Sequence, residues 1–273
     1  MLKQRVITAL ALAIVFIGTI LLADHRWVVA LFAVTLFAAS YELIVLTIKP
    51  GPTAGVVVAI IIASLFWILS DSSDIRINFY QSFTGLLLWV SILGLMLRYH
   101  FSGNWSLAVR IFQLLLGMTL LWICIHGLVF IHRHFEQGGW ILLYLLTLVW
   151  VADIGAYFSG HKFGKRKLAP GISPGKTWEG VVGGIILNIG WMFIVFAISN
   201  GWGIALWQFL LIGLATSIIS VIGDLYESIL KREALVKDSG KLLPGHGGVL
   251  DRIDSLIAAT PVFVVGLYVV GAV

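Results

Sequence analysis

Residues 139–158 read GWILLYLLTLVWVADIGAYF, and this stretch decides the class of fold. It matches the roughly 20 apolar residues that a helix needs to cross the hydrocarbon core of a bilayer, and it contains a single carboxylate, Asp153. Across the 273 residues, 60% are hydrophobic and only 11% are charged, against about 25% charged in a typical soluble domain. The composition therefore excludes a soluble fold and predicts an all-α polytopic membrane protein.

Apolar runs of this kind recur along the whole chain, which we expect to form a single integral membrane domain over residues 1–273. We predict nine transmembrane helices: Val6–Ala23, Trp27–Ile48, Ala54–Leu69, Phe83–Leu97, Val109–Phe130, Gly139–Phe158, Val181–Ser199, Ile204–Gly223 and Ser255–Val270. The first run follows basic residues as a signal peptide does, but no Ala-x-Ala cleavage pattern follows it, so we expect a retained span.

The distribution of basic residues predicts the orientation. With nine spans and a cytoplasmic N-terminus, only Arg26, Arg76 and Arg133 of the 18 Lys and Arg residues lie outside, as the positive-inside rule requires. The C-terminus then lies outside, and we expect a multi-pass protein of a bacterial-type inner (plasma) membrane. Segments 153–180 and 223–254 face the cytoplasm in this orientation.

These two cytoplasmic segments concentrate the acidic residues. They hold eight of the 13 carboxylates, namely Asp153, Glu179, Asp224, Glu227, Glu233, Asp238, Asp251 and Asp254. If the eighth span continues as helix past Gly223, Asp224, Glu227, Ser228 and Lys231 share one face, and Asp251 and Asp254 share a face at the start of the last span. Two such helix ends would form a carboxylate cluster suited to Mg²⁺ and substrate phosphates, although a surface salt-bridge network is an alternative.

Glycine-rich turns accompany these carboxylates. Residues 243–248, LPGHGG, cannot form a stable helix, and they offer backbone N–H groups to an anion, with His246 as a donor to phosphate or a proton-transfer group. Residues 173–177, SPGKT, resemble a Walker A motif, which we reject because the spacing from Gly171 fails by one and no strand is expected before it.

Other unusual residues have simpler interpretations. Cys124 lies alone in an apolar run and is expected to pack in the core, while residues 165–167 read as a lipid-facing basic cluster. A metal site at His126, His132 and His134 is disfavoured because only Glu136 lies beside them. The basic residues are mixed with carboxylates and glycines rather than aromatics, so no nucleic acid partner is expected.

Residues 228–254, SILKREALVKDSGKLLPGHGGVLDRID, resemble the signature of the phosphatidate cytidylyltransferases, also called CDP-diacylglycerol synthases. Residues 173–180, SPGKTWEG, are similar to a second stretch of that family. The resemblance implies that CTP and phosphatidic acid react to give CDP-diacylglycerol and pyrophosphate, through Mg-assisted in-line attack of the lipid phosphate on the α-phosphorus of CTP. It also implies a homodimer among membrane lipids.

The roles that we assign within this resemblance are hypotheses. As catalytic residues we take Asp224, Asp251, Lys231 and His246. The Mg²⁺ ligands are expected to be Asp224 and Asp251, with Glu227, Asp238 and Asp254 as further ligands, and a monovalent cation such as K⁺ is an additional candidate. Substrate binding is assigned to Ser173, Lys176, Thr177, Ser228, Arg232, Lys237, Gly247, Gly248 and Arg252.

Three other functions compete with this one. A CTP-dependent polyprenol or phytol kinase would attack the γ-phosphorus and release CDP. A lipid-phosphate transporter would need ionisable residues near the midplane and on both sides, whereas here they crowd one side. A purely structural subunit would leave the glycines and carboxylates without a purpose.

Overall fold

The computed structural model describes residues 2–49, 52–70, 74–103, 105–243, 245 and 247–272, with nine α-helices and one β-hairpin among them. The helices are α1 (Leu2–Leu22), α2 (His25–Thr47), α3 (Pro52–Leu69), α4 (Ile75–Met96), α5 (Leu107–His134), α6 (Gly138–Phe163), α7 (Trp178–Ser199), α8 (Leu206–Glu233) and α9 (Leu250–Val269). The hairpin strands are β1 (Lys167–Ala169) and β2 (Ser173–Thr177), and a 3₁₀ turn, η2 (Asn200–Gly203), joins α7 to α8.

Each predicted apolar run is a helix. Seven helices, α2 and α4 to α9, are long and apolar enough to cross a membrane, while α1 and α3 contain the shorter apolar stretches Leu10–Leu22 and Thr53–Leu69. The chain is thus an all-α, multi-pass membrane protein with one small hairpin that the sequence did not predict. The number of nine spans and their orientation stay predictions.

Helix ends differ from the predicted spans where polar residues extend a helix beyond its apolar run. Helix α4 begins at Ile75, ahead of Phe83, because the Asp74 side chain accepts a hydrogen bond from the Arg76 N–H at 2.8 Å and caps the helix. Helix α8 continues past Gly223 to Glu233, as the stripe of polar residues required.

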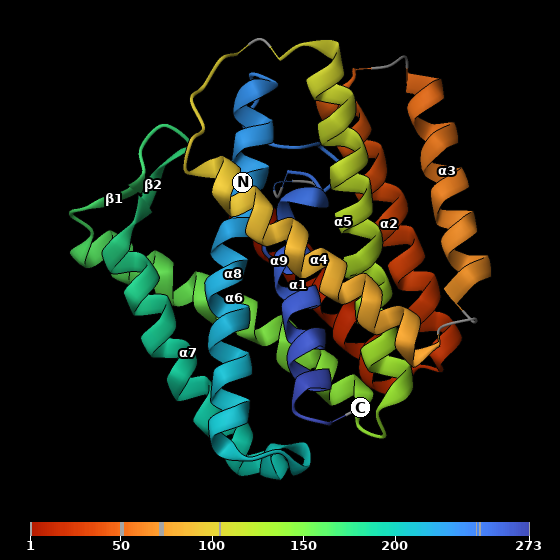
Figure 1. Cartoon of the computed structure of the whole chain (residues 1–273), viewed down its shortest axis with the longest axis vertical. Coiled ribbons are helices and arrows are strands. Elements are labelled where there is room, and N and C mark those ends of the chain that lie inside the picture. The colour runs from red at the N-terminus through yellow and green to blue at the C-terminus, as the bar shows by residue number, and fades with distance from the viewer. Residues whose placement is uncertain are drawn as a thin grey trace.

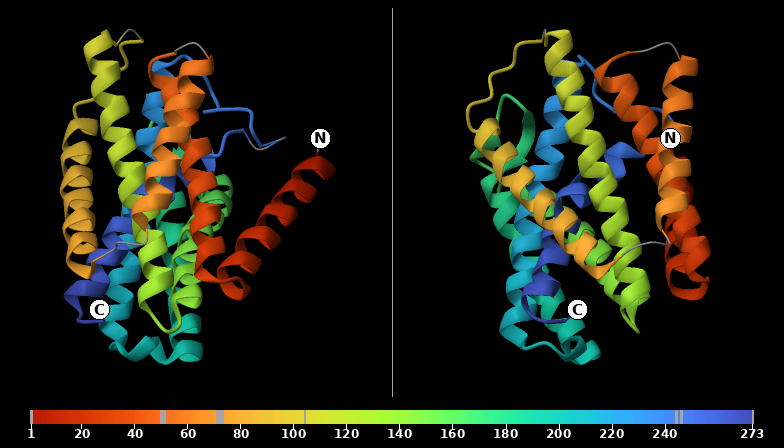
Figure 2. Two further views of the ribbon diagram at one scale, coloured as in Figure 1. Left: turned by 90° about the vertical axis from the view of Figure 1, so that its right-hand side faces the viewer. Right: turned by 45° about the vertical axis from the view of Figure 1, so that its right-hand side comes forward.

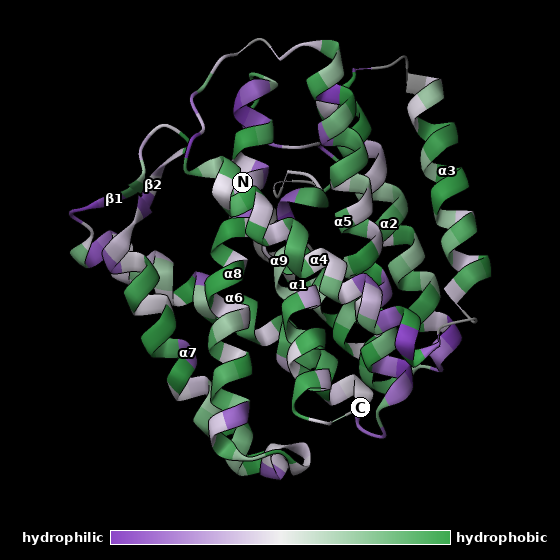
Figure 3. Ribbon diagram, viewed as in Figure 1, coloured by the Kyte–Doolittle hydropathy of each residue, from purple (hydrophilic) through white to green (hydrophobic). Residues whose placement is uncertain are grey.

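The connections between helices lie at two opposite ends of the bundle. The described residues of segments 97–106, 164–177 and 234–249 lie toward one end, the upper end in Figure 1, and we call this the site end. The α5–α6, α7–α8 and C-terminal segments lie at the other end. Helix α1 leans away from the bundle (Figure 2). Green apolar residues run along the helices, and purple residues gather at the upper end of α8, on the hairpin and at the lower right of the view (Figure 3).

The core lies where α2, α5, α6, α8 and α9 meet, and it is filled by leucine and aromatic side chains such as Leu43, Leu121, Leu145 and Phe263. Helices α6 and α7 approach closely because small residues face each other: a Cβ on Gly155 would come within 2.8 Å of the Gly184 Cα. This packing places the hairpin, which joins α6 to α7, beside the end of α8.

The hairpin corrects our statement that no strand precedes residues 173–177. Strands β1 and β2 are antiparallel, with Lys167 opposite Thr177 and Ala169 opposite Ser173. The Arg232 Nε–H donates to the Ile172 carbonyl at 3.1 Å and ties the turn to α8. Since Lys176 lies in a paired strand, its backbone cannot wrap a phosphate as a Walker A loop does, and that motif stays excluded.

Candidate active site

Helix α8 carries the predicted polar stripe into the site end. Ser228 Oγ donates to Asp224 Oδ1 at 3.4 Å, and Lys231 Nζ donates to Glu227 Oε2 at 2.6 Å, each across one helical turn. Because α8 continues as helix past Gly223, these four side chains line one face, as the spacing predicted.

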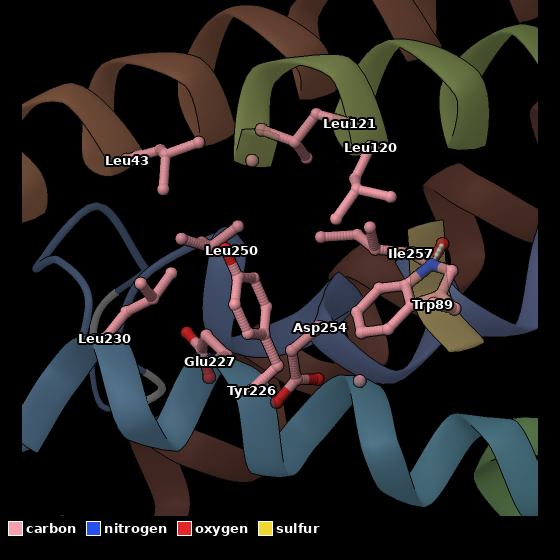
Figure 4. Close-up of a pocket in the computed structure, with 12 residues that line it drawn as sticks. Leu43, Trp89, Leu120, Leu121, Tyr226, Glu227, Leu230, Leu250, Asp254 and Ile257 are labelled. Atoms are coloured by element: carbon pink, nitrogen blue, oxygen red, sulfur yellow. Dashed lines mark hydrogen bonds between the residues drawn. The ribbon is translucent and has the colours of Figure 1, made fainter. Parts of the chain in front are cut away.

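Three carboxylates from two helices form a cluster. One oxygen each of Asp224, Glu227 and Asp254 lies within 4.8 Å of the others, and this is the only such group of three His, Cys, Asp or Glu residues in the described part of the chain. Gly223 makes the approach of α8 and α9 possible, since a Cβ there would lie 3.0 Å from the Ala258 Cβ and 3.2 Å from the Ser255 Cα. Figure 4 shows Glu227 and Asp254 between α8 and α9.

The back of this cluster is apolar. Trp89, Leu120 and Leu121 line a cavity of about 20 Å³ with Glu227 and Asp254 (Figure 4), and the Glu227 Oε1 atom is buried without a hydrogen-bond partner. An unpartnered buried carboxylate oxygen is costly unless a cation or water satisfies it. Asp224, Glu227 and Asp254 are therefore the described residues that could hold a cation.

Asp251 lies outside this group of three, in an ion pair. Its Oδ1 accepts a hydrogen bond from Lys231 Nζ at 2.7 Å, and its Oδ2 accepts from the backbone N–H groups of Ser239 at 2.9 Å and Gly248 at 2.8 Å. Lys231 thus bridges Glu227 and Asp251, with only 14% of its side chain exposed. We expected Asp251 to be a leading metal ligand, but the structure brings Asp254 to Asp224 and Glu227 instead.

A cavity of about 580 Å³ opens in front of Asp224. Its walls come from α6, α7, α8 and β2, with small and apolar residues such as Ala156 and Val181 among polar groups. The polar lining comprises Asp153, Tyr157, His161, Ser173, Lys176, Thr177, Ser217 and Asp224. The Lys176 ammonium forms an ion pair with Asp224 Oδ2, so this cation from the hairpin meets the carboxylate cluster at the cavity wall.

Several predicted substrate-binding residues also serve the fold. Thr177 Oγ1 accepts a hydrogen bond from the Gly180 N–H at 3.1 Å and caps α7, and Arg232 holds the hairpin turn. Ser173 lines the cavity beside Lys176, and Arg252, which is exposed, is one of the charges that act on Asp153.

The glycine-rich connection between α8 and α9 faces carboxylates. A Cβ on Gly247, whose φ is +83°, would lie 2.8 Å from Asp251 Oδ2, and a Cβ on Gly248 would collide with the carboxylate of Glu42. Lys237 and Asp238 are exposed on this connection, and His246 lies outside the described residues.

Sequence reasoning missed Glu42 and underestimated Glu233. Both are buried, at 2% and 5% exposure. Glu233 accepts hydrogen bonds from the Tyr99 hydroxyl at 2.6 Å and the Ser102 N–H at 3.0 Å, and it fixes the α4–α5 connection. Burial, together with the Glu233 carboxylate, raises the pKa of Tyr99 above its usual range. A lone carboxylate in an apolar run was the signal that could have identified Glu42.

Cys124 and the histidines were the residues with simpler interpretations. Cys124 is fully buried against Leu256 and Thr260, which confirms its packing role. His126 hydrogen-bonds Asn78 at 2.8 Å while His132 stacks on His25, so the described histidines do not converge on a metal site.

Comparison with known proteins gives a consistent result. Residues 3–270 match the cytidylyltransferase family. The chain is 39% identical to a phosphatidate cytidylyltransferase of Haemophilus influenzae, over 96% of this chain and 97% of the relative. It is 37% identical to one of Pseudomonas aeruginosa, over 99% and 98%, and 31% identical to one of Bacillus subtilis, over 95% of each.

Proposed function

Because the chain belongs to the cytidylyltransferase family, we propose that it transfers a cytidylyl group from CTP to phosphatidic acid, giving CDP-diacylglycerol and pyrophosphate in phospholipid biosynthesis. The chain is accordingly an enzyme of the nucleotidyltransferase class. One observation carries the proposal: the carboxylates of Asp224, Glu227 and Asp254 converge beside Lys176 at the wall of a cavity of about 580 Å³.

The donor set of the cluster fits Mg²⁺. Three carboxylate oxygens from α8 and α9 are hard ligands of the kind this ion takes, usually together with substrate phosphates. Asp224, Glu227 and Asp254 would hold the ion, and the unpartnered Glu227 Oε1 would gain a partner. A bound Mg²⁺ supplies positive charge that stabilises the charge developing on the phosphates. Asp251 and Asp238 then have supporting roles, and a monovalent cation such as K⁺ stays a prediction.

The lysines provide the remaining positive charge. Lys176 approaches the cluster from the cavity side, and Lys231 lies behind it between Glu227 and Asp251. In the reaction, an oxygen of the lipid phosphate forms a bond to the α-phosphorus of CTP while the bond to pyrophosphate breaks. Both reactants are anionic, so positioning and charge neutralisation supply the catalysis, and no Ser or Cys nucleophile is needed.

The lining of the cavity supports placing the lipid in it. Small and apolar residues such as Ala156, Val181 and Val221 line it together with the polar Ser173 and Lys176 of the hairpin. An amphipathic molecule with a phosphate head matches this mixed lining better than a nucleotide does. We place the lipid phosphate at Lys176 and expect CTP to approach from the 234–249 connection.

The membrane arrangement follows from the same reasoning. The connections 97–106, 164–177 and 234–249 share the site end, as alternating spans require. We propose nine spans in a bacterial-type inner membrane, with a cytoplasmic N-terminus and the active site facing the cytoplasm, where CTP is available. A homodimer stays a prediction from the family resemblance.

Position-specific labelling of CTP tests the reaction. The purified protein in detergent is incubated with phosphatidic acid and CTP labelled at the α- or γ-phosphorus, with and without Mg²⁺. Cytidylyl transfer carries the α-label into the organic phase and leaves the γ-label in pyrophosphate. A lipid kinase would carry the γ-label into the lipid and release CDP. The proposal is refuted if neither the α-label nor the γ-label enters the organic phase.

A further inference from the structure

Glu42 is a buried carboxylate that the mechanism above does not use. It lies near the site end of α2, in an otherwise apolar stretch, and is 2% exposed. A buried carboxylate is costly unless it is hydrogen-bonded, and ionisable residues within a transmembrane helix usually have a defined partner. Its contacts therefore indicate what it does.

Those contacts all lie on the α8–α9 connection and the start of α9. Glu42 Oε2 accepts hydrogen bonds from the Leu250 N–H at 2.8 Å and from the Ser239 Oγ at 3.2 Å. Leu250 is the first residue of α9, and no side chain of the adjacent N-cap residue, Val249, caps this helix. The carboxylate of α2 thus satisfies an N–H group that the local sequence leaves without a cap.

Glycines on the connection allow this approach. A Cβ at Gly240 or Gly248 would collide with the Glu42 carboxylate. Ser239 and Gly248 also donate their backbone N–H groups to Asp251, which pairs with Lys231. Glu42 and Asp251 therefore hold the same connection from two sides, and a continuous chain of contacts runs from α2 to the carboxylate cluster through Lys231.

We propose that Glu42 is a positioning residue: by clamping the α8–α9 connection and the first turn of α9, it sets the place of Asp251, Lys231 and Asp254 for the reaction. Its side chain is long enough to accept hydrogen bonds from Leu250 and Ser239, and it is not a ligand of the metal or substrate. The expected changes in kcat and in the Mg²⁺ requirement rest on the proposed function. The expected change in hydrogen exchange of the connection can be measured without activity.

Two substitutions separate reach from charge. Glu42→Asp keeps the charge but withdraws the carboxylate by one methylene, so that it no longer reaches Leu250 and Ser239. Glu42→Gln loses the charge but keeps the length, with an oxygen in the Oε2 position that accepts both hydrogen bonds and the amide nitrogen in place of Oε1, which is buried without a hydrogen-bond partner. A positioning role therefore predicts that Gln is tolerated better than Asp, and a role as metal ligand or charge partner predicts the reverse.

The kinetic test measures kcat, the KM for CTP and the Mg²⁺ concentration for half-maximal rate. Loss of a residue that orients metal ligands typically costs about 10- to 100-fold in metal affinity or activity, so Glu42→Asp is expected to lower kcat and raise the Mg²⁺ requirement by at least about tenfold. Glu42→Gln is expected to lose less than Glu42→Asp in both quantities. Wild-type kinetics for Glu42→Asp, or a larger loss for Gln than for Asp, would overturn the proposal.

Hydrogen exchange of the peptide covering residues 236–256 gives the readout that does not need activity. Glu42→Asp should speed exchange at the Gly248 and Leu250 amides, and Glu42→Gln should not. Unchanged exchange in Glu42→Asp contradicts the clamp, even if the wild type makes no CDP-diacylglycerol, an outcome that would refute the proposed function alone.

Glu233→Asp is the matched control, because it shortens an equally buried carboxylate at the same end that holds the α4–α5 connection. It should leave the Mg²⁺ requirement and the exchange of residues 236–256 unchanged, and the same shifts in this control would overturn the assignment. If Glu42→Asp does not fold, Ser239→Ala removes one donor to Glu42 and should change exchange in the same direction. An unchanged Ser239→Ala protein would also count against the clamp.

Discussion

Asp251 and Asp254 lie three residues apart at the start of α9, yet the structure gives them opposite environments, so their amide variants should behave in opposite ways. Asp251 pairs with Lys231 and accepts two backbone N–H groups. Asp254 faces two other carboxylates, Asp224 and Glu227. Asp251→Asn should therefore destabilise the protein with or without Mg²⁺, whereas Asp254→Asn should remove only the stabilisation that Mg²⁺ confers.

The magnitudes follow from the contacts. Removing one partner of a buried ion pair costs about 3–5 kcal/mol, and Lys231 keeps Glu227 at 2.6 Å, so we expect Asp251→Asn to cost about 2–3 kcal/mol, or about 4–12 °C in Tm. Asp254 lies with two other carboxyl groups and forms no ion pair among the described residues, so Asp254→Asn is expected to cost little when no cation is bound, because carboxyl groups this close do not all ionise.

The assay is thermal unfolding of each purified protein in detergent, followed by tryptophan fluorescence in EDTA and in Mg²⁺. Wild type should gain stability with Mg²⁺, Asp251→Asn should unfold earlier in both conditions, and Asp254→Asn should nearly match wild type in EDTA and gain nothing from Mg²⁺. The reasoning is refuted if Asp254→Asn is destabilised in EDTA as strongly as Asp251→Asn, or if Mg²⁺ still raises its Tm as it does for wild type.

Three further predictions concern the cavity, the connection and the orientation. Lys176→Met should lower kcat/KM by about 10- to 100-fold, because a hydrogen bond to a charged group contributes about 1.5–3 kcal/mol. Lys167→Met, on the exposed part of the hairpin, should leave kcat/KM unchanged, and equal losses in the two variants would contradict the placement of the lipid phosphate. Gly247→Ala should cost about 1–3 kcal/mol because its φ is +83°, whereas Gly171→Ala, where a Cβ meets nothing within 4 Å, should be neutral in the same thermal assay. A single cysteine at Asn200, in a chain without Cys124, should react with an impermeant maleimide added outside intact cells, and a cysteine on the 234–249 connection should not; the reverse pattern would invert the orientation.

The helices and the polar stripe of α8 were predictable because each depends on short-range spacing. Apolar runs locate helices whatever surrounds them, and Asp224 and Lys231 share a face once the helix continues past Gly223. The carboxylate cluster was predicted in kind, since acidic helix ends from α8 and α9 meet. Its three members were all among the five predicted ligands, but the pairing of Asp251 with Lys231 was not predicted. Asp251 and Asp254 both face α8, and the position of α9 along α8, fixed in part by the close contact at Gly223, decides which of them meets Asp224 and which meets Lys231.

The role of Glu42 could not be predicted from the sequence, for a different reason. Its hydrogen bond to Leu250 joins residues 208 positions apart, and no local pattern in α2 points to that partner. The hairpin was missed because its strands are short and lie between two long apolar helices, where the same residues read equally well as a loop. Both features depend on how helices distant in sequence pack together.

The glycines of the α8–α9 connection acquire a different explanation from the one that their sequence suggested. A glycine-rich turn before a helix normally indicates an anion held by backbone N–H groups. Here the Gly248 N–H donates to Asp251, and Gly240 and Gly248 make room for the carboxylate of Glu42. Two acidic side chains already occupy the positions where an anion would bind, and they would repel a phosphate. This favours our placement of the lipid phosphate at Lys176, the cation that pairs with Asp224 at the cavity wall.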